Sequence, residues 1–402
     1  MQLTTKEYLV SKKRIQVVDL VRAFSILIVI AMHFGLLWIS KPSEPFFPHY
    51  FWYRFMINGG FGVTVFFVVS GFVITRLIAS QPDGLFNPDL KEFYTRRIAR
   101  IFPLLILVCF LGITILTLFP EKSQAFKYII NDPTAPMNSA SWISIATFTF
   151  NWYLILSMPL HEKLHTGMLW SVLWSLSIEE QFYFFYPLVL KFLRNKRNLI
   201  LFLSFLVLGG IGSTKALSYF FPNQAHLTEN SFRNFSFIAI GCLLYLISAQ
   251  YEKILSRNKK MCFLFSAFGF FSFGGFYWHN YVSVNYWWFF WGTPYFEIWI
   301  PTFLAFGAFF FLLGGLHLDL FNSKYWSVLG WIGKLSYGGY LYHAFILYLL
   351  WPFFTGKNEW FDFFILITVT FVLAELSYRY FEVPANLWIR KKLGTINNNL
   401  TK

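Results

Sequence analysis

The chain has 402 residues, of which 56% are hydrophobic and 13% are charged, and its formal net charge is +14. A soluble domain carries about 25% charged residues, so this composition excludes a water-soluble globular protein and indicates that the chain lies in a lipid bilayer. Its basic residues gather in short segments between apolar runs, as they do in cytoplasmic loops, and this pattern argues against nucleic acid as a partner.

In chain order, nine apolar runs are candidates to cross a hydrocarbon core about 30 Å thick. The first begins near Val17, and we interpret it as a retained helix and not a signal peptide, because it carries Asp19, Arg22 and His33 and has no small-residue cleavage site. The predicted spans lie near residues 17–38, 59–79, 101–119, 199–215, 232–249, 262–280, 296–316, 327–351 and 361–381.

The region 142–193 is predicted to supply one further crossing. The distribution of Lys and Arg places the N-terminus inside and the segment 120–140 outside, so 142–193 must cross a net single time. Either 142–158 or 169–190 spans, and the other stretch is interfacial or re-entrant. Re-entrant backbone is tolerated only where it is buried in protein or lines a cavity, so this region is a place to expect a site.

The fold class predicted is therefore all-α, a polytopic integral membrane bundle of about ten transmembrane helices with both termini in the cytoplasm. One membrane domain is expected to fill residues 1–402, with its spans at about 14–385 and short cytoplasmic tails at 1–13 and 386–402. The basic clusters expected on the cytoplasmic side are Lys12–Arg14, Arg76–Arg100, Lys191–Arg197, Lys253–Lys260 and Arg390–Lys392.

The three cysteines lie inside apolar runs and lack CxxC spacing. This arrangement argues against a disulfide framework or a zinc site, and no metal site is predicted. Cys109, Cys242 and Cys262 are expected to be packing residues.

Two histidines and an arginine lie within predicted spans, where an ionisable group costs about 2.5–3.5 kcal/mol on insertion scales. Arg22 and His33 are 11 residues apart, close to three turns, so they share one face of the first helix. His343 is expected at the depth of His33, because both spans run from inside to outside. A histidine hydrogen-bonded within a bundle is the plainer explanation of either one, but two at matched depth favour function.

Glu179 and Glu180 stand side by side between apolar stretches. One of them could orient a histidine or a substrate hydroxyl, and the alternative is that they neutralise buried arginines. Arg97 and Arg100, at i and i+3, share a helical face and suit bidentate binding of phosphate. Positive-inside topology is the competing explanation for both arginines.

Taken together and in order, these residues resemble the acyltransferase 3 family of membrane acyltransferases. The likeness extends from Arg14 to Pro384. There are two departures, which weaken any inference about the acceptor: Thr64 replaces a common acidic residue, and Leu20-Val21 separates Asp19 from Arg22 where relatives often have Gly-Leu. The resemblance rests on Arg22 and His33 with ten residues between, Phe66–Phe72 (FFVVSGF), Arg97–Arg100 (RIAR), Trp174–Tyr183 (WSLSIEEQFY), Ser336-Tyr337 through His343, and Glu382 with Pro384.

The resemblance implies transfer of an acyl group, usually acetyl, from cytoplasmic acyl-CoA to a hydroxyl of a carbohydrate or glycolipid, such as lipopolysaccharide O-antigen or an exopolysaccharide. Acetyl-CoA would be a donor substrate, and no permanently bound cofactor is expected. The many Phe residues and the Asn-rich tail suggest an AT-rich bacterial genome and hence the inner membrane. Some relatives carry an additional C-terminal esterase-like domain, and the chain resembles the stand-alone form.

The resemblance assigns function to the arginine and the histidine of the first helix and to the paired arginines, which are Arg22, His33, Arg97 and Arg100 here. With Arg96, the three arginines are predicted to hold the CoA phosphates at the cytoplasmic mouth. The alternative is a transporter or flippase of a lipid-linked sugar, which would also need ten helices and intramembrane charges. Such a protein would not bind CoA, and the paired arginines would then reflect topology alone.

The predicted chemistry uses His33 as the general base on a sugar hydroxyl, with Glu179 or Glu180 orienting it. Ser70 or His343 is expected to donate a hydrogen bond to the oxyanion. A covalent acyl intermediate on Ser70 is the alternative route.

Overall fold

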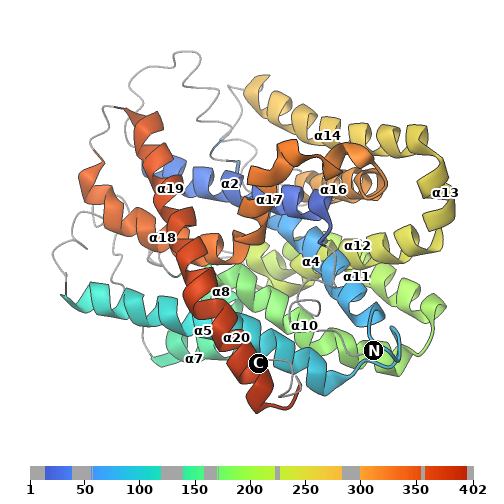
Figure 1. Ribbon diagram of the computed structural model, residues 1–402, viewed down its shortest axis with the longest axis horizontal. Coiled ribbons are helices and arrows are strands. Elements are labelled where there is room, and N and C mark those ends of the chain that lie inside the picture. The colour runs from blue at the N-terminus through green and yellow to red at the C-terminus, as the bar shows by residue number, and fades with distance from the viewer. Residues whose placement is uncertain are drawn as a thin grey trace.

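The computed structural model describes residues 14–38, 56, 58–118, 139–157, 170, 172–221, 227–282, 299–354 and 358–395, and every regular element in these ranges is helical (Figure 1). The predicted N-terminal tail and most of the predicted external segment 120–140 lie outside them. The α-helices in these ranges are α2 (Gln16–Trp38), α4 (Phe61–Ala79), α5 (Leu90–Leu118), α7 (Ser139–Ala146), α8 (Phe150–Ser157), α10 (Leu173–Leu193), α11 (Lys196–Phe220), α12 (Ser231–Gln250), α13 (Glu252–Arg257), α14 (Lys259–Val282), α16 (Ile300–Gly315), α17 (Ser327–Lys334), α18 (Ser336–Leu350), α19 (Glu359–Ser377) and α20 (Val383–Lys392).

Six stretches are helical, long and apolar enough to cross a membrane, and they confirm the prediction of an all-α polytopic membrane bundle. Four further helices, α10, α14, α16 and α18, coincide with the remaining predicted crossings, and the total of about ten stays a prediction. The six are Gln16–Leu36, Phe61–Ala79, Leu90–Thr114, Lys196–Phe220, Ser231–Gln250 and Glu359–Lys392.

The region 142–193 divides into one long helix and a pair of short ones. α10 runs for 21 residues, whereas α7 and α8 have 8 residues each, too few to cross the hydrocarbon core. Between the short helices, Phe148 adopts a left-handed φ of 55°, which interrupts the helical backbone. Of the two possibilities left open by the sequence, the stretch 169–190 therefore corresponds to the long helix.

The prediction of one continuous helix over 327–351 is wrong in one respect, because the structure divides this span at Leu335 into α17 and α18. The glycines around the break have low helix propensity. One of them allows a close approach, since a Cβ atom on Gly333 would lie 1.9 Å from the carbonyl oxygen of Asp19 in α2. The packing of α17 on α2 thus depends on this glycine.

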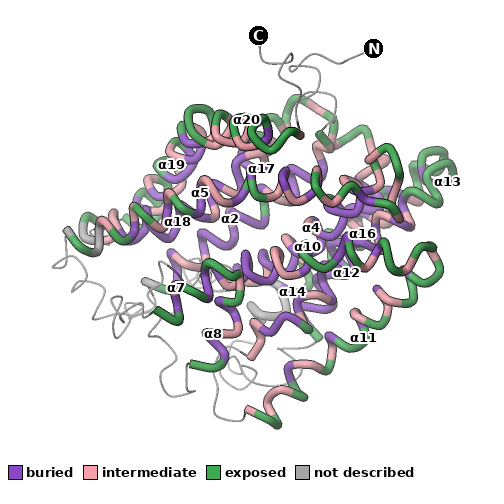
Figure 2. Tube along the Cα trace, turned by 90° about the horizontal axis from the view of Figure 1, so that it is seen from below, coloured by how far each residue is buried: buried purple, intermediate pink, exposed green. Residues whose placement is uncertain are grey.

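The core of the bundle lies along α2 and α4, in each of which 67% of an 18-residue stretch is buried, against 33% of such a stretch in α5 and in α11. Figure 2 shows the buried residues along these central helices and the exposed ones on α11, α13 and α20. α4 and α12 touch at Gly71 and Gly241, where a Cβ atom on either would lie 1.9 Å from a carbonyl oxygen of the other helix. Cys242 and Cys262 are buried in this core, which confirms them as packing residues.

Candidate active site

A cavity of about 620 Å³, which we call the basic cavity, opens among helix ends that the charge pattern placed on the cytoplasmic side. Its walls come from the start of α2, the end of α4, the first half of α5, the α17–α18 junction and the start of α20. Two carboxylates, Asp19 and Glu382, face a larger number of cations there. These cations are Arg14, Arg22, Arg76, Arg100 and Lys334.

Two arginines of this cavity, Arg22 and Arg100, form no ion pair with a described carboxylate. Arg14 forms a bidentate pair with Asp19 at 2.8 Å, and the Lys334 ammonium lies 4.3 Å from the ring centre of Tyr378. Among the residues that the structure describes, neither Arg22 nor Arg100 has a carboxylate within ion-pair distance. Guanidinium groups at membrane depth without a counter-ion favour the binding of an anion.

A second, smaller cavity of about 110 Å³, the inner cavity, adjoins the first and shares Arg22, Val73, Arg100 and Tyr337 with it. It lies deeper in the bundle, between α2, α4, α5, α10 and α18. Its polar lining is unusual for the interior of a membrane protein, where such groups mark a pathway or a site. The polar side chains at its wall include Ser70, Ser175, Glu179, Tyr183 and Tyr340.

The structure brings together two of the predicted catalytic residues, Ser70 of α4 and Glu179 of α10. The Ser70 hydroxyl donates a hydrogen bond to Glu179 Oε1 at 2.5 Å, at the wall of the inner cavity. Within the described ranges, neither residue is hydrogen-bonded to His33, so Glu179 does not orient that histidine in this structure.

The neighbouring Glu180 pairs with Arg97 of α5, whose Nη2 lies 2.5 Å from Glu180 Oε1. The Arg97 guanidinium also lies 3.9 Å from the ring centre of Tyr183. For Glu180, the structure therefore bears out the alternative that a glutamate neutralises a buried arginine. Arg97 lines the inner cavity with its charge already balanced, unlike Arg100 one turn further along α5.

Gln181, the third consecutive polar residue of α10, connects this helix to α8 and α12. Its amide group donates to the carbonyl of Phe148 at 2.6 Å and to Asn151 at 2.8 Å, and it accepts from Ser231 at 2.6 Å. Successive residues of a helix project about 100° apart. Together, Glu179, Glu180 and Gln181 therefore hold α10 in one rotation about its axis.

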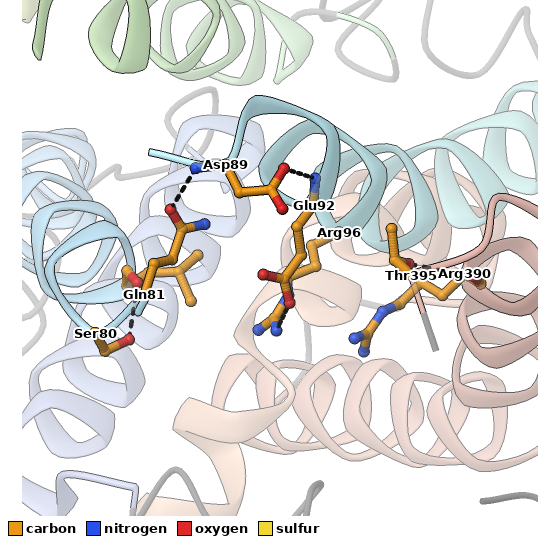
Figure 3. Close-up of polar contacts among 8 residues, drawn as sticks. Ser80, Gln81, Asp89, Glu92, Arg96, Arg390 and Thr395 are labelled. Carbon is orange, nitrogen blue, oxygen red and sulfur yellow. Dashed lines mark hydrogen bonds and ion pairs between the residues drawn. The ribbon is translucent and has the colours of Figure 1, made fainter. Parts of the chain in front are cut away.

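Arg96, the fourth predicted donor-binding residue, pairs with Glu92 one turn before it and lines neither of the two cavities (Figure 3). Figure 3 also shows the turn between α4 and α5. Asp89 accepts from the Glu92 backbone N–H at 2.9 Å, and its own N–H donates to the Gln81 side chain at 2.9 Å. These bonds fix the start of α5 and hence the position of Arg100 at the cavity.

His33 and His343 are in direct contact, which confirms that they lie at the same depth. Nε2 of His343 lies 3.2 Å from Nδ1 of His33, and the ring centres are 5.0 Å apart. Along α18, Tyr337 lines both cavities, Tyr340 lines the inner cavity, and His343 follows one turn later. One helix face thus leads from the basic cavity to the histidine pair.

Several residues of this arrangement were not singled out from the sequence. Tyr340 is the most central of them, since its hydroxyl is within hydrogen-bond distance of Ser175 Oγ at 2.7 Å and of the Val172 carbonyl at 2.8 Å. Its three-residue spacing from Tyr337 and from His343 is a helical periodicity that could have revealed it. Lys334 has the same spacing from Tyr337 but belongs to α17, and Glu382 was noted only for the family resemblance.

These features define a polytopic membrane protein with a cationic cavity that adjoins a polar inner chamber near paired histidines. The chain belongs to the acyltransferase 3 family, whose acyltransferase domain matches residues 15–379.

Curated relatives of the chain include three bacterial proteins. O-acetyltransferase OatA of Staphylococcus aureus is 27% identical over 399 residues, which cover 96% of this chain and 59% of the relative. Peptidoglycan O-acetyltransferase OatA of Listeria monocytogenes is 28% identical over 415 residues (96% and 57%), and putative peptidoglycan O-acetyltransferase YrhL of Bacillus subtilis is 28% identical over 383 residues (91% and 54%). The chain thus spans less than two thirds of the length of these relatives. No solved structure matches it.

Proposed function

We propose that the chain transfers an acetyl group from cytoplasmic acetyl-CoA to a hydroxyl of a cell-surface carbohydrate, in the cytoplasmic membrane of a bacterium. The observation that carries this proposal is the order of the site: two arginines without carboxylate partners, then a polar inner cavity, then a histidine pair. Each part matches one portion of the reaction, from the phosphates of the donor to the hydroxyl of the acceptor.

The basic cavity suits the phosphorylated end of the donor. Its volume of about 620 Å³ lies within the usual range of small-molecule sites, about 300–1,000 Å³. Arg22 and Arg100 stand where the two cavities meet, and their guanidinium groups can bind phosphate bidentately. Arg97 then serves as a brace for α10, so the donor-binding role falls to Arg22 and Arg100 rather than to all four predicted arginines.

The inner cavity suits the pantetheine arm, which carries two amide groups. An amide moved from water to a membrane interior needs hydrogen-bond partners, because leaving it unpaired costs several kcal/mol. Glu179 can accept from an amide N–H, and so can the oxygen of the Ser70 hydroxyl, whose own proton is donated to Glu179. The thioester is thereby carried toward the histidine pair.

At the far end, His33 removes the proton of the acceptor hydroxyl as its oxygen attacks the thioester carbon. The carbon–sulfur bond then breaks, and the CoA thiolate leaves and takes up a proton. The names of the Listeria and Bacillus relatives, both peptidoglycan O-acetyltransferases, support a peptidoglycan sugar as the acceptor. Lipopolysaccharide and exopolysaccharide are the other acceptors that the test below distinguishes.

The test is mass spectrometry of peptidoglycan fragments, lipopolysaccharide and exopolysaccharide from cells that make the wild-type chain or His33→Ala at matched membrane levels. His317→Ala is the control, because this histidine lines neither cavity. We expect one acetyl increment, on one class of glycan, with the wild type and the control but not with His33→Ala. Glycans of equal acetylation that differ in amount or location would instead identify a transporter.

A further inference from the structure

The two histidines of the site differ in their access to a ligand. His343 is 0% exposed, whereas His33 is half-buried. Each ring contacts a backbone carbonyl through Nδ1: His33 that of Val29 at 3.0 Å, and His343 that of Tyr340 at 2.6 Å. Since a carbonyl oxygen only accepts, both Nδ1 atoms carry a proton.

This assignment determines the direction of the hydrogen bond between the rings. A neutral imidazole with a proton on Nδ1 has a bare Nε2, so Nε2 of His343 is an acceptor. It lies 3.2 Å from Nδ1 of His33, which must therefore be the donor of that contact and shares its one proton between Nε2 of His343 and the Val29 carbonyl. Both ring nitrogens of His343 are then engaged, and no N–H of His343 remains for an oxyanion. Nε2 of His33 is left bare, and no described residue is hydrogen-bonded to it.

We infer that His343 is a positioning residue for the reaction: it accepts the Nδ1–H of His33 and so keeps Nε2 of His33 ready to take the proton of the acceptor hydroxyl. The inference rests on the proposed acyl transfer. It replaces the expectation that His343 donates a hydrogen bond to the oxyanion.

Proton balance is preserved through the step. The hydroxyl oxygen forms a bond to the acyl carbon, its proton moves to Nε2 of His33, and the carbon–sulfur bond breaks. His33 is then cationic, with its Nδ1–H still donated to His343, and a hydrogen bond from a charged donor is stronger than one from a neutral donor. The proton on Nε2 subsequently returns to the CoA thiolate, and both rings are neutral again.

The fold holds the imidazole ring of His343 in place. Its Nδ1–H donates a hydrogen bond to the carbonyl of Tyr340, and the Tyr340 hydroxyl is in turn anchored near Val172 and Ser175. Gly339 permits the close packing of α18, because a Cβ atom there would lie 3.0 Å from the ring of Phe371. A partner fixed in this way loses little entropy when it orients another residue, which is the condition for an effective positioning group.

The first test compares His343→Gln with His343→Leu in purified protein reconstituted in phosphatidylglycerol–phosphatidylethanolamine vesicles, with radiolabelled acetyl-CoA and muramidase-released peptidoglycan fragments. The glutamine amide oxygen can replace Nε2 as an acceptor, whereas leucine fills the space without one. We expect kcat to fall about 100-fold in His343→Leu, because a displaced reacting group costs about that factor. In His343→Gln, the fall should be less than about 10-fold, with KM for acetyl-CoA unchanged in both variants.

Leu347→Ala is the matched control, since Leu347 is also buried on α18, one turn beyond His343. It removes packing but no hydrogen-bonding group, so it should lower thermal stability but preserve kcat. Equal losses of kcat in the leucine and glutamine variants, with Leu347→Ala active, would overturn the inference.

The second test does not depend on activity. Solid-state NMR of ¹⁵N-histidine-labelled protein in the same vesicles, with His33 assigned by comparison with His33→Gln, reports which ring nitrogen is protonated. We expect a protonated Nδ1 and a bare Nε2 in both rings. A protonated Nε2 in His33 would overturn the inference even if transfer is observed. If the wild type shows the expected tautomers but transfers no acetyl group, the proposed function is refuted instead.

Discussion

Removing the guanidinium of Arg97 tests whether this residue braces the bundle or binds the donor. Arg97 joins α5 to α10 through Glu180, and the two side chains are 16% and 12% exposed. The variant Arg97→Ala leaves the carboxylate of Glu180 largely buried without its counter-charge. We therefore expect a large loss of stability, which the removal of a donor-binding cation would not cause.

The size of the effect follows from the burial of the pair. Breaking a buried ion pair by removing one partner costs about 3–5 kcal/mol, because the remaining charge is uncompensated. For a chain of this length, the melting temperature should fall by about 4–6 °C. The double variant Arg97→Ala/Glu180→Ala removes both charges, so it should be more stable than the sum of the single losses predicts, by about 1–3 kcal/mol.

Thermal unfolding of the wild type, both single variants and the double variant in one detergent measures this coupling. KM for acetyl-CoA is measured on the same samples. Arg100→Ala is the matched control, since Arg100 lies three residues further along α5 and has no carboxylate within ion-pair distance among the described residues. It should retain the melting temperature and raise KM.

The reasoning is refuted if Arg97→Ala melts with the wild type and raises KM as much as Arg100→Ala does. That result would make both arginines donor-binding residues. Additive losses in the double variant would show that the contact between Arg97 and Glu180 contributes little to the fold.

Three further outcomes follow from the site and its packing. Arg22→Gln should raise KM for acetyl-CoA about 10- to 100-fold with a smaller change in kcat, since a hydrogen bond to a charged group is worth about 1.5–3 kcal/mol. An unchanged KM would show that Arg22 does not bind the donor. Gly241→Ala should abolish a monodisperse peak in size-exclusion chromatography, whereas Gly209→Ala, where nothing lies within 4 Å of the added Cβ, should preserve it. Gln181→Leu should lower both melting temperature and kcat at constant KM, and wild-type values would show that its contacts do not hold α10 in place.

Much of this protein could be predicted from local patterns. Apolar runs of sufficient length must be helical in a bilayer, because the backbone has no other way to satisfy its hydrogen bonds there. Helical periodicity then placed Arg22 and His33 on one face of α2, and the alternation of basic loops predicted which ends of the helices gather at the basic cavity. The equal depth of His33 and His343 followed from the same counting.

The class of protein, the positions of the helices and the depth of their charges could all be predicted from the sequence, since these depend on residues near one another in the chain. Tertiary structure decided which charges meet. Arg97 and Arg100 share a face of α5, and Glu179 and Glu180 are neighbours, yet Arg97 pairs with Glu180 while Glu179 binds Ser70. Adjacent residues on a helix point about 100° apart, so their partners depend on the rotation of α10, which contacts with α4, α5, α8 and α12 fix.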